Sequence, residues 1–376
     1  MGEVSVDLPI RPDTVLSLGK GSALSDLGTV FGEGDTLYAS MLADIRAATR
    51  TIRLESYILS SDEIGRRFAT ALVERAQAGL DVRVHLDAAG TLFEGGDAIF
   101  SVLKKGGVAT QWFNRWSWRN PLRYNRRNHR KLLVIDDRCV YIGGFNLHRE
   151  SSLRLVGHER WRDIHVCIPG PLARQAANLF DALWDNQVDE SVPPWVGPHR
   201  LVPNVTRACQ RVLHCEFINA FNAAKKSIDL CTPYFVPHRR FRAALIAAAR
   251  RGVDVRVLMP VRSDVPLVEW AAHALAWPLV RKGIAFFEYS PRMLHSKVTL
   301  IDGRWSMVGS ANIDYRSFFV NRELNLISTA PEVCRQIGVQ LQTDFSQALR
   351  LRPRSGQSVR LRSLAESAGH RIRRWL

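Results

Sequence analysis

The chain alternates between short runs of β-branched or apolar residues and longer segments in which apolar residues recur at helical spacing. Residues 51–59 (TIRLESYIL) and 227–235 (SIDLCTPYF) have the composition of buried strands. A helical pattern follows each run, at 62–78 and at 239–251. Both helical patterns lead through a glycine into a second strand, with the sequences GLDVRV and GVDVRV. The chain is therefore predicted to contain an internal duplication.

Strands that alternate with helices indicate an α/β fold in which helices cover a sheet. The duplication predicts two pseudo-symmetric α/β sandwich halves packed side by side. Prolines and glycines interrupt regular structure between the halves and indicate a linker there. The expected divisions are an N-terminal extension at 1–24, a first half at 25–190, a linker at 191–207, a second half at 208–350 and a C-terminal tail at 351–376.

The composition indicates a folded protein with an anionic partner. With 46% hydrophobic residues among 376, the chain has enough material for two ordinary cores. Its net charge of +16 indicates an anionic partner, which could be nucleic acid, a phosphorylated substrate or an acidic membrane surface. The six cysteines show neither the paired spacing of a zinc site nor a disulfide framework, so we expect no metal and a reducing compartment. Because we find no secretion signal and no apolar run of about 18 residues, we expect any membrane contact to be peripheral.

The strongest chemical signal is the pattern His-x-Lys-x4-Asp, which occurs once in each repeat. On a strand, residues two apart face the same side, so each histidine is expected to project together with its lysine. The aspartate has an odd offset and falls at the end of the strand, where we predict a structural role in a turn. The motif residues are His129, Lys131 and Asp136 in the first repeat and His295, Lys297 and Asp302 in the second.

The flanking sequence of the motif is duplicated too. An asparagine lies 17 residues after each motif histidine, at Asn146 and Asn312. A single His-x-Lys pair would more simply be a surface histidine or a satisfied core histidine. Two copies with identical offsets favour a functional reading, and a non-catalytic scaffold is the weakest alternative because neither copy has lost its histidine or lysine.

These residues resemble the two HKD motifs of the phospholipase D (PLD) superfamily, and the resemblance extends over residues 25–350. Within that superfamily the chain is most similar to bacterial cardiolipin synthases. The resemblance implies two PLD-like halves that meet across a pseudo-twofold axis and bring both histidines to one phosphate. The segments that carry the resemblance to the synthases include LESYI at 54–58, NHRK at 128–131, WRD at 161–163 and TPYFVP at 232–237.

The resemblance also implies a two-step exchange that needs no cofactor. By family analogy, His129 is the nucleophile that forms a phosphohistidine, and His295 is the general acid and base. Cationic and amide side chains would then hold the phosphate in place of a metal. The groups expected to bind the phosphate oxygens are Lys131, Lys297, Asn146 and Asn312, with Ser310 in a supporting role.

Each reactive histidine needs a partner that fixes its tautomer. The resemblance assigns this role to two carboxylates. Glu323 lies 28 residues after His295 and matches the orienting carboxylate of the family. Asp163 is expected to take the corresponding place for the first-half histidine. Two alternatives for the first half are Glu150 and Glu159.

A segment rich in tryptophan and arginine leads into the first motif. Residues 112–127 contain five arginines, three tryptophans and no acidic residue. This composition is typical of a bilayer interface, and it would also suit single-stranded nucleic acid or an ordinary basic loop. The residues predicted to contact a membrane or a lipid headgroup are Trp116, Trp118, Arg126 and Arg127.

Two further segments bear on the partner. Residues 349–376 contain eight arginines and one acidic residue, with apolar residues at roughly helical intervals. This pattern favours a basic amphipathic helix on anionic lipid over a solvated tail. Residues 265–280 are apolar but too short and too interrupted to span a bilayer, and we predict a core helix or a wall of an acyl groove.

We therefore expect a phosphatidyltransferase that joins two phosphatidylglycerol molecules into cardiolipin and releases glycerol, although phosphatidylethanolamine could also be the donor. Two alternatives are a phospholipase D that forms phosphatidic acid and a nuclease or phosphodiesterase that acts on nucleic acid. Anionic phospholipid at a membrane surface is the expected partner, and nucleic acid is the less favoured one. The expected location is the cytoplasmic face of a bacterial inner membrane, as a peripheral protein.

Overall fold

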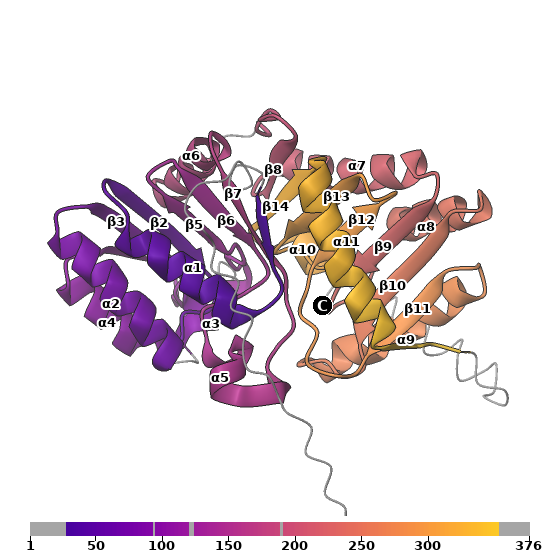
Figure 1. Cartoon of the computed structure of the whole chain (residues 1–376), viewed down its shortest axis with the longest axis horizontal. Coiled ribbons are helices and arrows are strands. Elements are labelled where there is room, and N and C mark those ends of the chain that lie inside the picture. The colour runs from indigo at the N-terminus through magenta and orange to yellow at the C-terminus, as the bar shows by residue number, and fades with distance from the viewer. Residues whose placement is uncertain (1–27, 93–94, 120–123, 189–190, 353–376) are drawn as a thin grey trace, which may run out of the picture.

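The computed structural model describes residues 28–92, 95–119, 124–188 and 191–352. Within these ranges the chain forms two α/β halves that lie side by side, the first at the left of Figure 1 and the second at the right. Each half contains one mixed sheet flanked by helices. The predicted duplicated α/β architecture is confirmed.

The sheet of the first half has seven strands in the order β1-β7-β6-β5-β2-β3-β4, and only the β2-β3-β4 portion is parallel. The strands are β1 (Thr29–Phe31), β2 (Thr51–Ser56), β3 (Asp81–Asp87), β4 (Ala109–Phe113), β5 (Leu132–Ile135), β6 (Cys139–Gly143) and β7 (His165–Pro169). The helices are α1 (Gly34–Arg46), α2 (Glu63–Gln77), α3 (Ala88–Leu92), α4 (Gly96–Lys105), α5 (Leu153–Val156) and α6 (Leu172–Trp184).

The sheet of the second half has eight strands in the order β15-β11-β10-β9-β12-β13-β14-β8. The strands are β8 (His199–Asn204), β9 (Ser227–Cys231), β10 (Asp254–Pro260), β11 (Ala285–Tyr289), β12 (Val298–Ile301), β13 (Trp305–Gly309), β14 (Glu323–Ser328) and β15 (Ala348–Arg350). The helices are α7 (Arg207–Ala223), α8 (Arg239–Arg250), α9 (Pro266–Val280), α10 (Tyr315–Phe319) and α11 (Pro331–Ser346).

Strand β8 corrects the predicted boundary between the halves. It lies inside the segment 191–207, which was expected to be a linker, and it pairs antiparallel with β14 just as β1 pairs with β7. The prolines of this segment favour an interruption of regular structure. Pro203 nevertheless lies in an edge strand, where a missing N–H is tolerated. The second half therefore begins no later than His199, the first residue of β8.

Three large hydrophobic cores hold the layers of the described residues together, and a small fourth cluster packs α9 against Val236. One core joins α1, α2 and α4 to one face of the first sheet, and another joins α7, α8 and α9 to the second sheet. The third core lies between the halves and contains α6 and α11. Strand β6 contributes to two of these cores. Val140 and Ile142 belong to the core between the halves, and Tyr141 belongs to the core formed with α1, α2 and α4. Such strands are apolar throughout because both of their faces are buried.

Glycines end the two matching helices. Gly79 after α2 and Gly252 after α8 have φ values of +90° and +87°. Their N–H groups bond back to the last helical turn, at Ala76 and Ala249. Left-handed backbone at this position favours glycine, which explains why the helix-glycine-strand pattern is present in both repeats.

The motif aspartates fix the corners of the sheets, as predicted. Asp136 follows β5 and accepts the backbone N–H groups of residues 49, 50 and 51 at 2.8 Å each. Asp302 follows β12 and accepts those of residues 225, 226 and 227 at 2.7–2.9 Å. Both have φ values near +50°, at 53° and 51°. Each aspartate therefore anchors the end of the strand that follows its histidine to the start of the neighbouring antiparallel strand, β2 or β9.

No helix in the described ranges is long and apolar enough to cross a bilayer. Helix α9, which covers the apolar segment at 265–280, buries Val268, Ala271, Leu275 and Leu279. This burial fits the predicted core helix. The N-terminal extension at 1–24 and the basic tail, apart from residues 351 and 352, lie outside the described residues.

Candidate active site

The two histidine-lysine pairs enter the site along short extended segments. His129 and Lys131 directly precede β5, and His295 and Lys297 directly precede β12, so they lie just ahead of the predicted strands. Each segment forms a parallel bridge with the other half, at Asn128–Arg322 and at Arg162–Leu294. The N–H of His129 donates to Arg322 O at 2.9 Å, and the N–H of His295 donates to Arg162 O at 2.7 Å. The backbone of each half thus holds the motif of the other.

The carboxylates that orient the histidines are exchanged between the halves. Nδ1 of His129 lies 3.0 Å from Oε2 of Glu323, and Nδ1 of His295 lies 2.6 Å from Oδ2 of Asp163. Both carboxylates are buried. The sequence-based pairing of Asp163 with the first-half histidine is therefore wrong, because each carboxylate contacts the histidine of the other half. The alternatives Glu150 and Glu159 are exposed.

The topology explains this exchange. Asp163 and Glu323 occupy equivalent places, because His165 faces Gly143 in one sheet just as Asn325 faces Gly309 in the other. Both carboxylates follow the cross-half bridges, so their side chains reach the opposite motif. Distance along the chain carries no information about this contact.

The two lysines are buried beside their histidines. Nζ of Lys131 donates to His129 O at 2.7 Å and lies 5.2 Å from the ring centre of Tyr57. Nζ of Lys297 lies 2.8 Å from Nδ1 of His295 and 3.8 Å from Oδ2 of Asp163, and it also donates to His295 O. His and Lys thus share one side of the segment. The intervening Arg130 turns away and forms an ion pair with Glu55 at 3.0 Å, as the spacing predicted.

Burial shifts the pKa values of all four groups. It lowers the pKa of His129, against the opposing charge of Glu323, and it lowers the pKa of His295 further because the two lysines add to the effect. Burial and then the charge of Lys297 lower the pKa of Lys131 to about 7. Burial lowers the pKa of Lys297 to about 8. Two cations held together out of water form a site that a bound anion would stabilise.

The two predicted asparagines point polar atoms into the same region. Asn146 and Asn312 are buried, both line the pocket at the histidines, and the side-chain oxygen of each has no hydrogen-bond partner among the described residues. The N–H of Asn312 is held by the hydroxyl of Ser317 at 3.0 Å. A buried amide oxygen without a partner is costly unless a donor, such as a hydroxyl group of a bound headgroup, completes its hydrogen bond.

One pocket of about 500 Å³ connects these groups. Both histidines and both asparagines line it, and its wall comes from the two halves. The other lining side chains include Tyr57, Tyr124, Arg127 and Trp161 from the first half and Tyr234, Asp264, Asp314 and Arg316 from the second. Its size suits a phosphodiester headgroup rather than a whole lipid. The structure therefore brings the predicted histidines and asparagines together in one cavity.

Ser310 supports the site through its backbone. Its hydroxyl accepts from the N–H of Leu324 at 3.0 Å, and its carbonyl oxygen lies 3.0 Å from Nδ1 of His129. The equivalent residue of the first half is Gly144, where an added Cβ would clash with the carboxylate of Asp163. The asymmetry between the copies therefore follows from the position of that carboxylate.

The predicted headgroup contacts separate into two groups. Arg127 is buried, lines the pocket and stacks its guanidinium 4.1 Å from the ring centre of Tyr124. Two of its nitrogens, Nε and Nη2, are buried without a hydrogen-bond partner among the described residues. Trp116, Trp118 and Arg126 instead lie at the surface, and Trp118 is 87% exposed.

Two aromatic residues of the site received no predicted role. The ring of Tyr57 lies 5.0 Å from that of His129, and the ring of Trp161 lies 5.2 Å from that of His295. Both belong to the segments LESYI and WRD that carry the family resemblance. Those segments were the available signal. Arg162, beside Trp161, forms a buried ion pair with Asp344 at 2.8 Å and so connects the halves.

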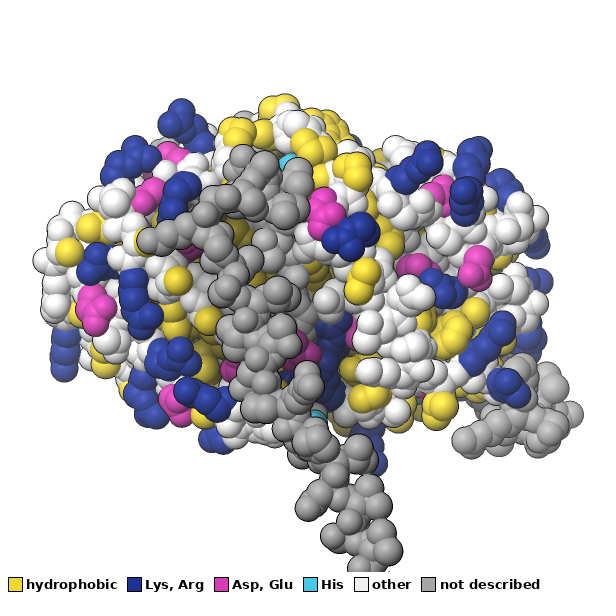
Figure 2. Space-filling view, in the orientation of Figure 1, with side chains coloured by type: hydrophobic (Ala, Val, Ile, Leu, Met, Phe, Trp, Pro, Cys, Tyr) yellow, Lys and Arg dark blue, Asp and Glu magenta, His cyan; other side chains and the backbone are white. Residues whose placement is uncertain are grey.

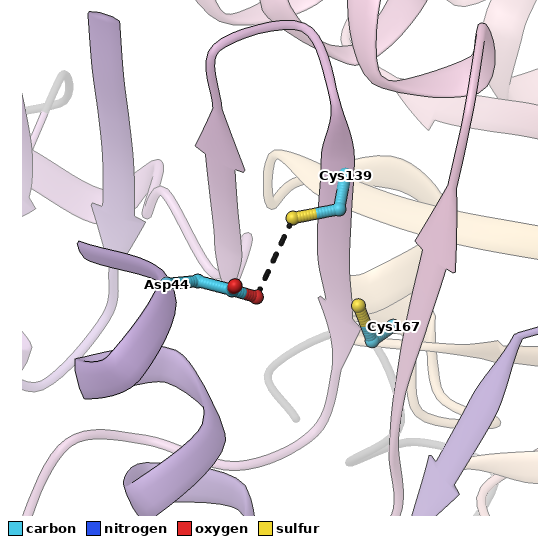
Figure 3. A group of neighbouring side chains, drawn as sticks. All are labelled: Asp44, Cys139 and Cys167. Carbon is cyan, nitrogen blue, oxygen red and sulfur yellow. Dashed lines mark hydrogen bonds between the residues drawn. The ribbon is translucent and has the colours of Figure 1, made fainter. Parts of the chain in front are cut away.

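A separate cluster of metal-ligand types lies in the first half, where α1, β6 and β7 come together (Figure 3). Asp44, Cys139 and Cys167 form it, but Asp44 already accepts the hydroxyl of Tyr141 at 2.6 Å. The hydrogen bond with Cys167 and burial raise the pKa of Cys139. Asp44 also accepts the thiol of Cys139 at 3.6 Å, so the cluster is already internally hydrogen-bonded and we assign no metal to it. The six cysteines all lie within the described ranges and form no disulfide.

Comparisons with known proteins agree with this geometry. The family profile described as "Cardiolipin synthase, PLD-like domain" matches residues 41–184 and 217–345, one range in each half. Cardiolipin synthase A of Pseudomonas entomophila is 34% identical over 327 residues, which cover 84% of this chain and 68% of that protein. A probable cardiolipin synthase of Bacillus subtilis is 32% identical and is covered over 67% of its length.

The fold has a solved counterpart. Phosphatidylserine synthase of Haemophilus influenzae superimposes with a TM-score of 0.73 over 94% of this chain and 96% of that one, at 15% identity. At this identity the match shows the shared fold. The profile matches both repeats, and the relatives match across most of the chain. The chain is therefore a member of the cardiolipin synthase family of PLD-like domain proteins.

Proposed function

We propose that this protein is a phosphatidyltransferase that forms cardiolipin from two phosphatidylglycerol molecules and releases glycerol. The observation that carries the proposal is the pair of histidines in one pocket, each with its Nδ1 on a buried carboxylate from the other half. Relatives that bear the name cardiolipin synthase support a phospholipid substrate. The positive charge, spread over both halves on the face in Figure 2, suits an anionic lipid.

The contacts of His129 support its role as nucleophile. Its Nδ1 faces two acceptors, the carboxylate of Glu323 and the carbonyl oxygen of Ser310, each at 3.0 Å. Because a carbonyl oxygen can only accept, Nδ1 carries the proton and Nε2 keeps its lone pair. The lowered pKa keeps the ring neutral near pH 7. A neutral imidazole with a fixed tautomer is prepared to attack phosphorus through Nε2.

The contacts of His295 support a role in proton transfer. Its Nδ1 lies between the carboxylate of Asp163 and the ammonium of Lys297, at 2.6 and 2.8 Å. The ring can therefore donate through Nδ1 or accept there, and its protonation responds to the site's charge. A bound phosphodiester adds negative charge, which raises the pKa of His295 and lets it hold a proton.

The reaction then proceeds in two balanced steps. In the first step, Nε2 of His129 forms a bond to phosphorus while the bond between phosphorus and the oxygen of the headgroup glycerol breaks. His295 gives that oxygen a proton, and glycerol leaves. A second phosphatidylglycerol enters, its headgroup hydroxyl returns a proton to His295, and its oxygen displaces the histidine. Cardiolipin leaves, and both imidazoles recover their starting state.

Four side chains would stabilise the charge on the phosphate oxygens. Lys131 and Lys297 supply positive charge, and Asn146 and Asn312 supply amide N–H donors. Removal of one such donor typically costs about 3 kcal/mol of transition-state stabilisation. Because these groups provide the electrostatic stabilisation, turnover is expected to continue in the presence of EDTA.

The proposed place of action is the cytoplasmic face of a bacterial inner membrane, to which the protein would bind peripherally. Support comes from the exposed Trp116 and Trp118 and from the exposed Arg126 beside the pocket. Tryptophan and arginine together favour the bilayer interface. Arg127 would contact the headgroup phosphate inside the pocket through its free N–H groups.

A product assay tests the proposal. Purified protein is incubated with vesicles of radiolabelled phosphatidylglycerol, and the lipids are separated. Cardiolipin and free glycerol in equal amounts are expected, and both His129→Ala and His295→Ala should abolish them. Phosphatidic acid without cardiolipin would identify a phospholipase. Cleavage of DNA or RNA without lipid turnover would identify a nuclease.

A further inference from the structure

Apolar side chains are exposed at the start of α9, beside the pocket. Leu267 and Trp270 lie one helical turn apart and are 46% and 41% exposed, and Val265 just before the helix is 37% exposed. Residues three apart share one face of a helix, so Leu267 and Trp270 form a continuous apolar surface. The other face of α9 is buried through Val268.

This first turn belongs to the wall of the site. Val265 and Val268 line the pocket, while Leu267 and Trp270 do not. The turn is held in place, because the carboxylate of Glu269 accepts the N–H of Ser263 at 2.9 Å. Helix α9 therefore presents one side to the pocket and another to solvent, right at the rim.

The first half contributes a matching rim. Trp116 is 50% exposed, and its ring packs edge-on against Trp118 at 5.8 Å and against Tyr124 at 5.4 Å. Tyr124 lines the pocket, so the two exposed tryptophans adjoin the cavity from the first half. Exposed apolar side chains thus border the pocket on elements from both halves.

Exposed arginines accompany both rims. Arg115 and Arg119 flank the two tryptophans. Arg262 precedes the turn that leads into α9, where the carboxylate of the exposed Asp264 accepts the hydroxyl of Tyr234 at 2.7 Å. Apolar side chains bordered by arginine match an anionic bilayer, in which the apolar groups enter the acyl region and the cations bind phosphate. A bilayer also explains why this surface adjoins the pocket, because a lipid substrate enters from it. A protein partner would not require the pocket to lie beside the surface.

We propose that the exposed first turn of α9 (Leu267 and Trp270) is a second membrane-docking element, which works with Trp116 and Trp118 to seat the pocket mouth on an anionic phospholipid surface. The inference rests on the proposed function, because a lipid substrate must reach the pocket from a bilayer. Two contacts from different halves would fix the orientation of the mouth, which one contact cannot do.

The chain offers a matched control for the test. Trp195 is 43% exposed, close to the value for Trp270, but it precedes β8 and does not line the pocket. The variants are the double substitution Leu267→Ser with Trp270→Ser, and Trp195→Ser alone. Each full-length protein is mixed with vesicles of equal parts phosphatidylglycerol and phosphatidylcholine, and binding is measured by flotation. Turnover is measured on these vesicles and on a monomeric short-chain phosphatidylglycerol.

The double variant is expected to bind vesicles roughly 10-fold or more weakly, because two apolar side chains no longer enter the bilayer. Its turnover on vesicles should fall in parallel, while turnover of the monomeric substrate stays within about 2-fold of wild type. Trp195→Ser should behave as wild type in all three measurements. Circular dichroism of each variant checks that the fold is retained.

Several results would overturn the inference. The first is unchanged vesicle binding by the double variant. The second is an equal loss of vesicle binding in Trp195→Ser. The third is a loss of turnover on the monomeric substrate as large as the loss on vesicles. Dissociation of a wild-type dimer by the double substitution would assign the surface to a second copy of the chain. If wild type consumes no phospholipid at all, the proposed function fails, but flotation still reports on the docking surface.

Discussion

The ring nitrogens of the two histidines have different neighbours although their sequence motifs are the same. At His129, Nδ1 faces only acceptors, so its tautomer is fixed. At His295, the same atom lies between an acceptor on Asp163 and a donor on Lys297. A fixed tautomer suits a nucleophile, and an adjustable one suits a group that gives and takes a proton. The near-symmetric sequence therefore folds into a site whose two histidines have different hydrogen-bond partners, which supports the proposed division of roles.

The first prediction concerns Glu323→Gln. A glutamine keeps the size of the side chain but removes the charge that stabilises the imidazolium-like ring of the phosphohistidine, so kcat should fall roughly 100-fold or more. Single-turnover labelling with 32P-phosphatidylglycerol should show slower formation of the protein adduct. The control is Glu332→Gln, at a glutamate that pairs with Arg335 on the outside of α11. Equal rates in the two variants would contradict the orienting role.

The second prediction concerns the pH dependence of anion binding. Protonated lysines bind anions, and the pKa values of Lys131 and Lys297 are about 7 and about 8 in the free protein. The dissociation constant for sulfate, whose charge is constant in this range, should therefore rise about 10-fold or more between about pH 7 and pH 9. Calorimetric titration measures it. Lys131→Met and Lys297→Met should each bind sulfate more weakly at the lower pH and show a flatter pH dependence.

At the scale of single elements, the corner aspartates hold strands in register. Asp302 lies after β12, and its three backbone donors hold the pKa of its carboxyl below the ordinary value although burial alone would raise it. This contribution to stability is present above the unfolded-state pKa of 3.8 and is lost as the pH falls through the lower folded-state pKa.

The third prediction follows from these bonds. Asp302→Ala should lower the free energy of unfolding by about 2 kcal/mol at neutral pH, because three N–H groups lose a charged acceptor. The difference from wild type should shrink once the pH is low enough to protonate the carboxylate in both folded and unfolded chains. Denaturant unfolding measures it. Asp254→Ala, at an exposed side chain that begins β10, serves as the control and should change stability little.

The fourth prediction uses the close approach of β6 to the start of β7. A methyl group at Gly144 would meet the carboxylate of Asp163, so Gly144→Ala should push that carboxylate away from His295. We expect kcat to fall about 10-fold or more and stability to fall by about 1–3 kcal/mol. Gly338→Ala is the matched control, since a Cβ there would meet only a side-chain methyl group of Leu300 at 3.5 Å. A fall in kcat as large in that variant would contradict the steric explanation.

Sequence periodicity predicts the elements well where pattern and burial coincide. The helix predicted at 62–78 is α2, and the strand after Gly79 is β3. The prediction fails at β8, because Pro203 reads as a break although an edge strand accepts it. The sequence predicted histidines and asparagines that the structure brings to one pocket, but it missed Tyr57 and Trp161, and it missed the exchange of Glu323 and Asp163, which reach the opposite half through space. Local patterns cannot encode such long-range contacts.

At the scale of the whole molecule, the halves form a single catalytic unit. Each motif lies on a bridge to the other half, and each histidine depends on a carboxylate from across the interface. The shared core between α6 and α11 holds this interface together. Displacement of one half by a fraction of a hydrogen-bond length would therefore disturb both histidines at once.

Arg162 is a buried cation at this interface. Its Nε donates to Asp344 on α11 at 2.8 Å, its Nη2 donates to Gln340 at 2.8 Å, and its Nη1 donates to Asp163 O at 3.0 Å. Its own carbonyl oxygen accepts the N–H of His295. Arg162 thus connects the backbone that holds His295 to helix α11. Burial raises the pKa of Asp344, and the charge of Arg162 opposes that rise.

The fifth prediction is that Arg162→Met lowers the free energy of unfolding by about 3–5 kcal/mol at about pH 8, because Asp344 becomes an unpaired buried charge. Without the guanidinium, the pKa of Asp344 rises further above its unfolded-state value of 3.8. Protonation then removes the buried charge, so the loss should be smaller at about pH 5. Adding Asp344→Leu should recover at least half of the lost stability by denaturant unfolding, since it replaces the stranded charge with apolar packing. If Asp344→Leu does not recover stability, the stranded charge is not the cause, and Arg162 acts through the backbone groups that it contacts. In that case turnover should also stay low in the double variant.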